Sequence, residues 1–109
     1  MSRLVIFDLL HGEVIRLLER WGERRLASEV ERAGESHDVY TFLDRAFSMY
    51  YAEYGGVNCR WLREELQRDW DRVVGVVLPA LLRQYLSARR RGGKGGEEAV
   101  EELRASTWA

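Results

Sequence analysis

Cysteine, proline and lysine are almost missing from this 109-residue chain. The one cysteine, Cys59, excludes an internal disulfide, and the one proline, Pro79, falls inside the most apolar stretch. Sixteen of the seventeen basic residues are arginine, with Lys94 the exception, and asparagine occurs once. Scarce amides fit a thermophilic source, whereas an arginine excess also fits a GC-rich genome, so the sequence leaves the source open.

Long hydrophobic runs are also missing. The longest uncharged run, Val73 to Leu82, has ten residues, against the roughly 20 that a helix needs to cross a bilayer. Near the N-terminus the apolar run from Leu4 to Phe7 is interrupted by Asp8, which makes it a poor signal peptide. We therefore expect a cytoplasmic protein that does not enter a membrane.

Neither sign of charge prevails, since the net charge is -1. Residues 1–34 carry six basic and six acidic side chains, and the surplus of basic charge falls in residues 59–91. Any basic surface must therefore be local. A global attraction to nucleic acid or to anionic membranes is not expected.

The chain does have helical periodicity. In residues 2–33 the apolar positions follow alternating spacings of three and four, with His11 on the same stripe, and Gly34 is suited to end the helix. Gly22 interrupts this pattern, so residues 2–33 form either one helix or two. The stripe consists of Leu4, Phe7, Val14, Leu18 and Trp21.

A second helix is expected to follow, with Ser36 or Asp38 as its cap. It should run to about Tyr54, because Gly55 and Gly56 then break the helical pattern. Its apolar stripe consists of Tyr40, Leu43, Phe47, Tyr50 and Tyr54.

The third and longest helix is expected from Asn58 to Arg91. An eleven-residue repeat keeps one of its faces apolar over a long distance, and beyond Trp70 the apolar positions spread over roughly two thirds of the circumference. Pro79 cannot donate to the carbonyl of Gly75, so a kink or break is expected there. The alternative is two shorter helices that meet near Leu78. The repeat positions are Cys59, Leu62, Leu66, Trp70, Val73, Val77 and Leu81.

These patterns predict an all-α fold with a single core. It is a small bundle of three long helices, the third kinked or broken at Pro79, with a short C-terminal helix. Residues 1–91 form the bundle domain, residues 92–96 a glycine-rich linker, and residues 97–109 a short helix or a tail.

The apolar third helix leads to the main functional hypothesis. A segment apolar over two thirds of its girth needs neighbours on several sides, and one chain supplies only the two preceding helices. A homodimer that packs this helix against its copy would supply the missing cover. We expect an interaction or scaffold domain, such as a subunit of a larger assembly. The expected interface residues are Trp70, Val73, Val74, Val77, Leu78, Leu81, Leu82 and Tyr85.

The alternative hypothesis is nucleic-acid binding through basic residues. In the first half of the third helix, acidic side chains such as Glu64 neutralise the arginines, which is typical of a solvated surface. An uncompensated patch remains at the far end, where it would contact phosphates. This patch consists of Arg83, Arg89, Arg90 and Arg91.

Arg32 and His37 are separated by four residues. This spacing resembles the Arg-x4-His element of HEPN-type ribonuclease domains, which are also helical and dimeric. The resemblance implies that the pairs from two protomers would form an RNA-cleaving site, with Arg32 and His37 as catalytic residues. Ala33 stands where those domains commonly carry asparagine, and Gly34 would put the pair across a loop. The alternative is that His37 is a surface histidine next to a helix cap.

Other catalytic or metal-binding arrangements are not found. His11 and Asp8 fall short of the three or four protein ligands that zinc requires, so His11 is expected to be a hydrogen-bonded or rim histidine. No phosphate-binding loop and no nucleophile with its base can be assembled. We therefore expect no metal, no cofactor and, outside the HEPN-like hypothesis, no enzyme. Small helical proteins of this kind occur in viruses, in toxin–antitoxin pairs and in multisubunit complexes.

Overall fold

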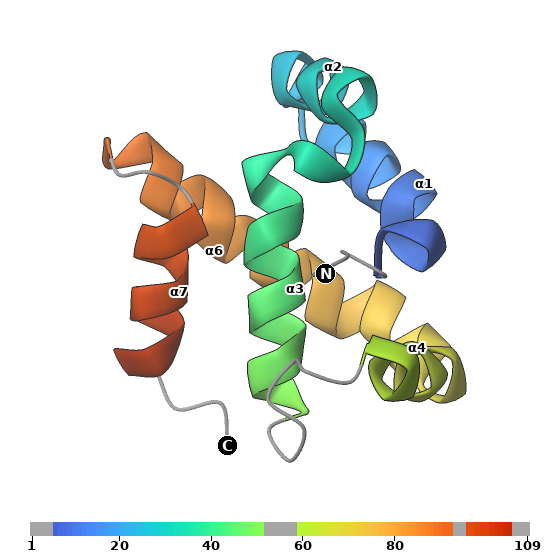
Figure 1. Cartoon of the computed structure of the whole chain (residues 1–109). Helices are drawn as coiled ribbons and strands as arrows, with labels where there is room; N and C mark the ends of the chain where they lie inside the picture. Colours follow the sequence, from blue (N-terminus) through green and yellow to red (C-terminus); the bar gives the residue numbers. More distant parts are fainter. Residues whose placement is uncertain (1–5, 52–58, 93–95, 106–109) are drawn as a thin grey trace.

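The computed structural model describes residues 6–51, 59–92 and 96–105. Every regular element in these ranges is a helix, which confirms the predicted all-α class (Figure 1). The layout differs from three long helices, because the chain divides into more and shorter pieces. The elements are α1 (Ile6–Arg20), α2 (Arg24–Ala33), η1 (Gly34–Ser36), α3 (Asp38–Tyr50), α4 (Cys59–Arg68), α5 (Trp70–Arg72), the π-helix η3 (Val73–Val77), α6 (Leu78–Arg90) and α7 (Gly96–Ala105).

The first predicted helix is two helices. α1 ends at Arg20 and α2 begins at Arg24, because Gly22 adopts a φ of 82°, in the left-handed region that glycine enters without steric cost. α2 then folds back against α1 (Figure 1). Gly34 ends α2 as predicted, with a φ of 62° and with its N–H donated to the carbonyl of Val30.

The cap of α3 is His37. Its Nδ1 accepts a hydrogen bond from the backbone N–H of Val39 at 3.1 Å, and its backbone is extended, as that of a cap residue is. The prediction of Ser36 or Asp38 was wrong, because an imidazole nitrogen can accept the same bond. The hydroxyl of Ser36 donates instead to the carbonyl of Ala33.

The third predicted helix is disturbed before Pro79 and not at it. α4 ends at Arg68, and Asp69 leaves the helical conformation with a φ of -110° and a ψ of 31°. Leu78 then donates to the carbonyl of Val73, five residues back, which makes a π-turn. Pro79 follows in the first turn of α6, where the missing N–H is tolerated.

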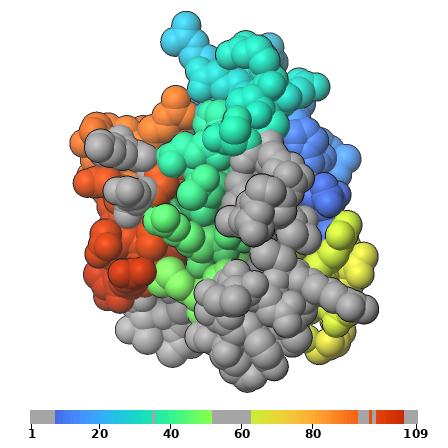
Figure 2. Space-filling model, viewed as in Figure 1, coloured from blue at the N-terminus to red at the C-terminus, as the bar shows by residue number. Residues whose placement is uncertain are grey.

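The C-terminal segment is a docked helix. Ala99, Val100 and Leu103 of α7 are buried, and α7 contacts both α3 and α6. Figure 2 shows the side chains of α7 lying directly against those of α3. Gly96, which the sequence places in the linker, is the first residue of α7.

The core is centred on α3, which lies between α1 and α7 (Figure 1). Its Tyr40, Phe42 and Phe47 are fully buried, and Val14 and Leu18 of the predicted first stripe are buried as expected. Leu4, Tyr54, Gly55, Gly56, Asn58 and Lys94 lie outside the described residues, and so do the side chains of Phe7, Cys59 and Leu62.

Candidate functional site

The predicted interface residues lie mostly inside the chain's own core. Trp70 and Val74 are partly exposed. Both α3 and α7 contact α6, so α7 supplies cover that was not expected from the two preceding helices. A second copy would therefore meet this segment on its opposite side. The six buried residues are Val73, Val77, Leu78, Leu81, Leu82 and Tyr85.

The opposite side of the same segment is open to solvent. Val76 is 63% exposed, Gly75 and Ala80 are exposed beside it, and Pro79 is partly buried. We call these four residues the outward face. The sequence did not predict this face, because the segment is apolar over roughly two thirds of its circumference. Periodicity then does not tell which side of the helix the chain itself covers.

A charged residue stands at each end of the outward face. At one end Asp71 is exposed and, among the described residues, has no ion-pair partner. At the other end Arg83 lies over the ring of Trp21, 4.5 Å from its centre, and meets no carboxylate in the described part of the chain. Arg72, next to Asp71, is neutralised by Asp69 at 2.8 Å.

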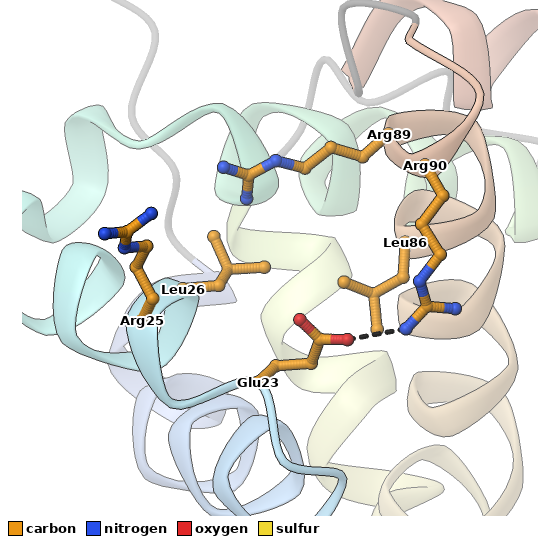
Figure 3. Close-up of a pocket in the computed structure, with 6 residues that line it drawn as sticks. All are labelled: Glu23, Arg25, Leu26, Leu86, Arg89 and Arg90. Atoms are coloured by element: carbon orange, nitrogen blue, oxygen red, sulfur yellow. Dashed lines mark hydrogen bonds and ion pairs between the residues drawn. The ribbon is translucent and has the colours of Figure 1, made fainter.

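The predicted basic patch at the end of α6 is largely neutralised by glutamates from other helices. Arg83 meets no carboxylate in the described part of the chain. For the residues from Arg89 to Arg91 the description as uncompensated was wrong, because their glutamate partners are distant in the sequence. These pairs are exposed and individually weak, but they lower the local positive potential. Figure 3 shows the pair of Arg90 and Glu23. The pairs are Arg89 with Glu29 at 3.6 Å, Arg90 with Glu23 at 2.5 Å, and Arg91 with Glu102.

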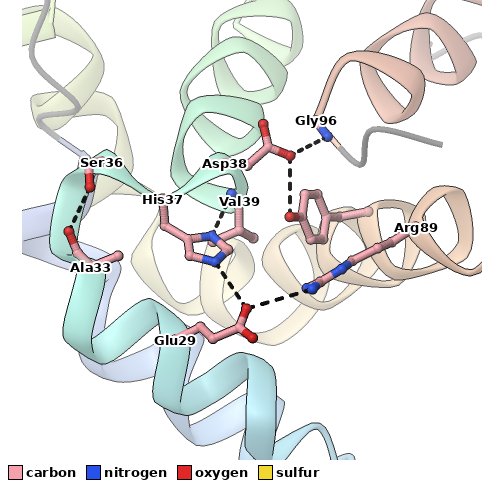
Figure 4. Close-up of polar contacts among 9 residues, drawn as sticks. Glu29, Ala33, Ser36, His37, Asp38, Val39, Arg89 and Gly96 are labelled. Atoms are coloured by element: carbon pink, nitrogen blue, oxygen red, sulfur yellow. Dashed lines mark hydrogen bonds and ion pairs between the residues drawn. The ribbon is translucent and has the colours of Figure 1, made fainter. Parts of the chain in front are cut away.

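No hydrogen bond or ion pair joins His37 to Arg32 in the described part of the chain. The Nδ1 of His37 accepts the Val39 bond, and its Nε2 lies 3.7 Å from the carboxylate of Glu29 (Figure 4). Glu29 in turn faces Arg89, while Arg32 is exposed in the last turn of α2. The histidine that the HEPN resemblance would make catalytic therefore caps a helix in this fold.

Asp38 connects three helices. Its Oδ2 accepts the backbone N–H of Gly96 at 2.7 Å and the hydroxyl of Tyr85 at 3.3 Å (Figure 4). Burial and, after it, the negative charge of Asp38 raise the pKa of Tyr85. The hydroxyl therefore keeps its proton and stays a donor.

His11 is hydrogen-bonded, as predicted. Its Nδ1 lies 2.8 Å from the hydroxyl oxygen of Tyr40, and the two rings are stacked with centroids 5.9 Å apart. Burial raises the pKa of Tyr40 above that of an ordinary tyrosine. This pair belongs to the edge of the core and satisfies a buried hydroxyl.

Comparison of the chain with protein families, with characterised proteins and with solved structures finds no match. Across residues 6–51, 59–92 and 96–105, no helix combines the length and the apolar character that crossing a bilayer requires. In the same ranges no three His, Cys, Asp or Glu side chains gather as metal ligands would. Function must therefore be inferred from the surface of the chain itself.

Proposed function

We propose that this chain is a helical interaction domain that self-associates through its outward face. The observation that supports it is Val76, which is 63% exposed while Val77 and Leu78 beside it are buried. Burying one valine side chain contributes about 1.5 kcal/mol or more, and a two-fold contact would bury two. A self-associating domain of this kind suits a scaffold or a subunit of a larger assembly.

The shape of the outward face favours a helix as its partner. Gly75 and Ala80 carry little or no side chain, and a Cβ added at Gly75 would meet no atom within 4 Å. A second helix can therefore approach closely, with Val76 of one copy set against the small residues of the other. The π-helix that carries Gly75 and Val76 supports a role beyond packing, since such turns are frequent at functional sites.

The charges at the two ends favour an antiparallel pair of identical chains. Asp71 lies a turn before Gly75, and Arg83 lies almost a turn after Ala80. In an antiparallel two-fold dimer, Asp71 of each copy comes to the Arg83 end of the other, so two opposite-charge contacts form. A parallel pair would bring like charges together. The partner that fits best is thus a second copy of this chain.

Val76→Glu tests the face itself. A carboxylate placed in the apolar centre of the contact would have to lose its water, so the variant should be monomeric at concentrations where the natural chain is a dimer. Ala105→Glu, which adds the same charge at an exposed position of α7, is the matched control and should leave the dimer intact. Light scattering after size exclusion measures both masses. A dimeric Val76→Glu variant would remove the outward face from the proposal.

The orientation is tested by Asp71→Arg and Arg83→Asp. Each single change turns two attractive contacts into repulsive ones in the antiparallel dimer and should weaken it about tenfold. The double variant restores opposite charges and should regain most of the affinity, although it lacks the contact of Arg83 with Trp21. Single variants that dimerise like the natural chain would contradict the antiparallel arrangement and leave self-association standing.

A further inference from the structure

A pocket of about 180 Å³ opens between α2 and α6 (Figure 3). Leu26 and Leu86 form its apolar floor and are 4% and 5% exposed. An engineered apolar cavity of about 150 Å³ admits benzene, so the pocket has room for one small ring. The rim of the pocket consists of Glu23, Arg25, Arg89 and Arg90.

The rim carries more positive than negative charge. Arg90 is held by Glu23 at 2.5 Å, which neutralises both groups. Arg89 and Glu29 form an ion pair at 3.6 Å, a distance longer than a hydrogen bond, so the guanidinium keeps its donors for another acceptor. Arg25 has no ion-pair partner among the described residues.

The two arginines stand on different helices around the apolar floor. Figure 3 shows Arg89 reaching from α6 over Leu26, while Arg25 stands on the α2 side of the same opening. Planar guanidinium groups bind carboxylates with paired hydrogen bonds, which a lysine in the same place would not do. A neutral ligand would gain no charge-assisted hydrogen bond from these donors, and a cation would be repelled by the three guanidiniums.

We propose that this pocket binds a small organic anion, namely a carboxylate attached to a short apolar or aromatic group. The carboxylate lies between Arg25 and Arg89, and the apolar group covers Leu26 and Leu86. Glu23, held by Arg90, closes the remaining side of the rim. None of the four residues of the outward face lines the pocket, so this inference does not rest on self-association.

Sodium benzoate is a suitable probe, with the intact chain labelled for two-dimensional amide NMR. We expect saturable shifts centred on Leu26 and Leu86, with a dissociation constant on the order of 1 mM for so small a ligand. Benzyl alcohol tests whether binding needs the negative charge, and inorganic phosphate tests whether it needs the apolar group. Sodium chloride keeps the ionic strength equal in all titrations. Benzyl alcohol and phosphate should each bind at least about fivefold more weakly than benzoate, as judged from the same amides.

Arg25→Ala provides the decisive comparison, because Arg25 is exposed and its loss should not affect folding, which a thermal melt confirms. The variant should bind benzoate about fivefold more weakly. Arg104→Ala removes an exposed arginine from α7 and should bind like the natural chain. Absence of saturable shifts, equal binding of benzyl alcohol, or an unchanged affinity in Arg25→Ala would each overturn the proposal.

Discussion

The carboxylate of Asp38, the first residue of α3, accepts the backbone N–H of Gly96, the first residue of α7, at 2.7 Å. Two helix N-termini thus meet at one negative charge, which is favourable because helix N-termini carry partial positive charge. The contact is close, since a Cβ at position 96 would lie 2.6 Å from Oδ1 of Asp38 and would force this carboxylate to move. It fixes where α7 docks.

Gly96→Ala should therefore destabilise the chain. The added methyl group displaces Asp38, so the bonds from Gly96 and from Tyr85 are lost together. We expect a loss of about 1–3 kcal/mol in the free energy of unfolding, measured by urea denaturation. Gly12→Ala is the control, because the nearest atom to its added Cβ is 3.9 Å away, and it should be neutral or stabilising by up to about 1 kcal/mol. Equal effects of the two changes would contradict this role of Asp38.

Replacing His37 tests its role as the cap of α3. His37→Ala removes the acceptor for the N–H of Val39 and should cost about 1 kcal/mol of stability. His37→Asn supplies an amide oxygen as the acceptor instead, so it should lose at most a few tenths of a kcal/mol. Thermal unfolding compares the two variants. If both lost the same stability, the cap would not be the source of the effect.

Asp44 gives the stability a dependence on pH. Burial raises its pKa, and the charge of Arg45 opposes the shift only in part. The folded chain thus holds this proton more tightly than the unfolded chain, so the ionised form costs stability as pH rises above about 4. Asp44→Asn should stabilise the chain at neutral pH and have no effect near pH 3.

The control for this prediction is Glu31→Gln, an exposed change on α2. Its effect on unfolding should be small and similar at both pH values. Urea denaturation at the two pH values supplies the comparison. A loss of stability in Asp44→Asn at neutral pH would contradict the assigned direction of the pKa shift.

Neutralisation of the basic patch predicts weak binding of nucleic acid. Arg90 and Arg91 face Glu23 and Glu102, so the natural chain should not shift labelled RNA even at low salt. Removing the two carboxylates with Glu23→Gln and Glu102→Gln should release the charge and produce salt-sensitive binding. A shift by the natural chain that is lost when Arg89, Arg90 and Arg91 become alanine would instead support the nucleic-acid hypothesis.

Local periodicity predicts much of this fold and little of its long-range pairing. The buried stripe with Val14 and Leu18, the helix end at Gly34 and the hydrogen-bonded His11 follow from residues close in sequence. The break at Gly22 was an open alternative that the structure decides. Each of these features depends on spacings of three and four or on glycine, which a sequence displays directly.

The pairs that define the surface are separated by long stretches of chain. Asp38 and Gly96 are 58 residues apart, and Glu23 and Arg90 are 67 residues apart. No repeat links such positions, so the neutralised patch could not be predicted, and the sequence left open whether the C-terminal helix docks. Because α7 covers α6, most of the apolar residues expected at an interface lie in the core. Val76, on the other side of the segment, is exposed instead.

The mass of the natural chain in solution tests self-association most directly. Sedimentation equilibrium over a range of micromolar concentrations should give a species of twice the 12.7 kDa chain mass, shifting towards the monomer on dilution. High salt should weaken the dimer only modestly, because its centre is apolar and its charges lie at the two ends. A single species of 12.7 kDa throughout this range would contradict the proposed function.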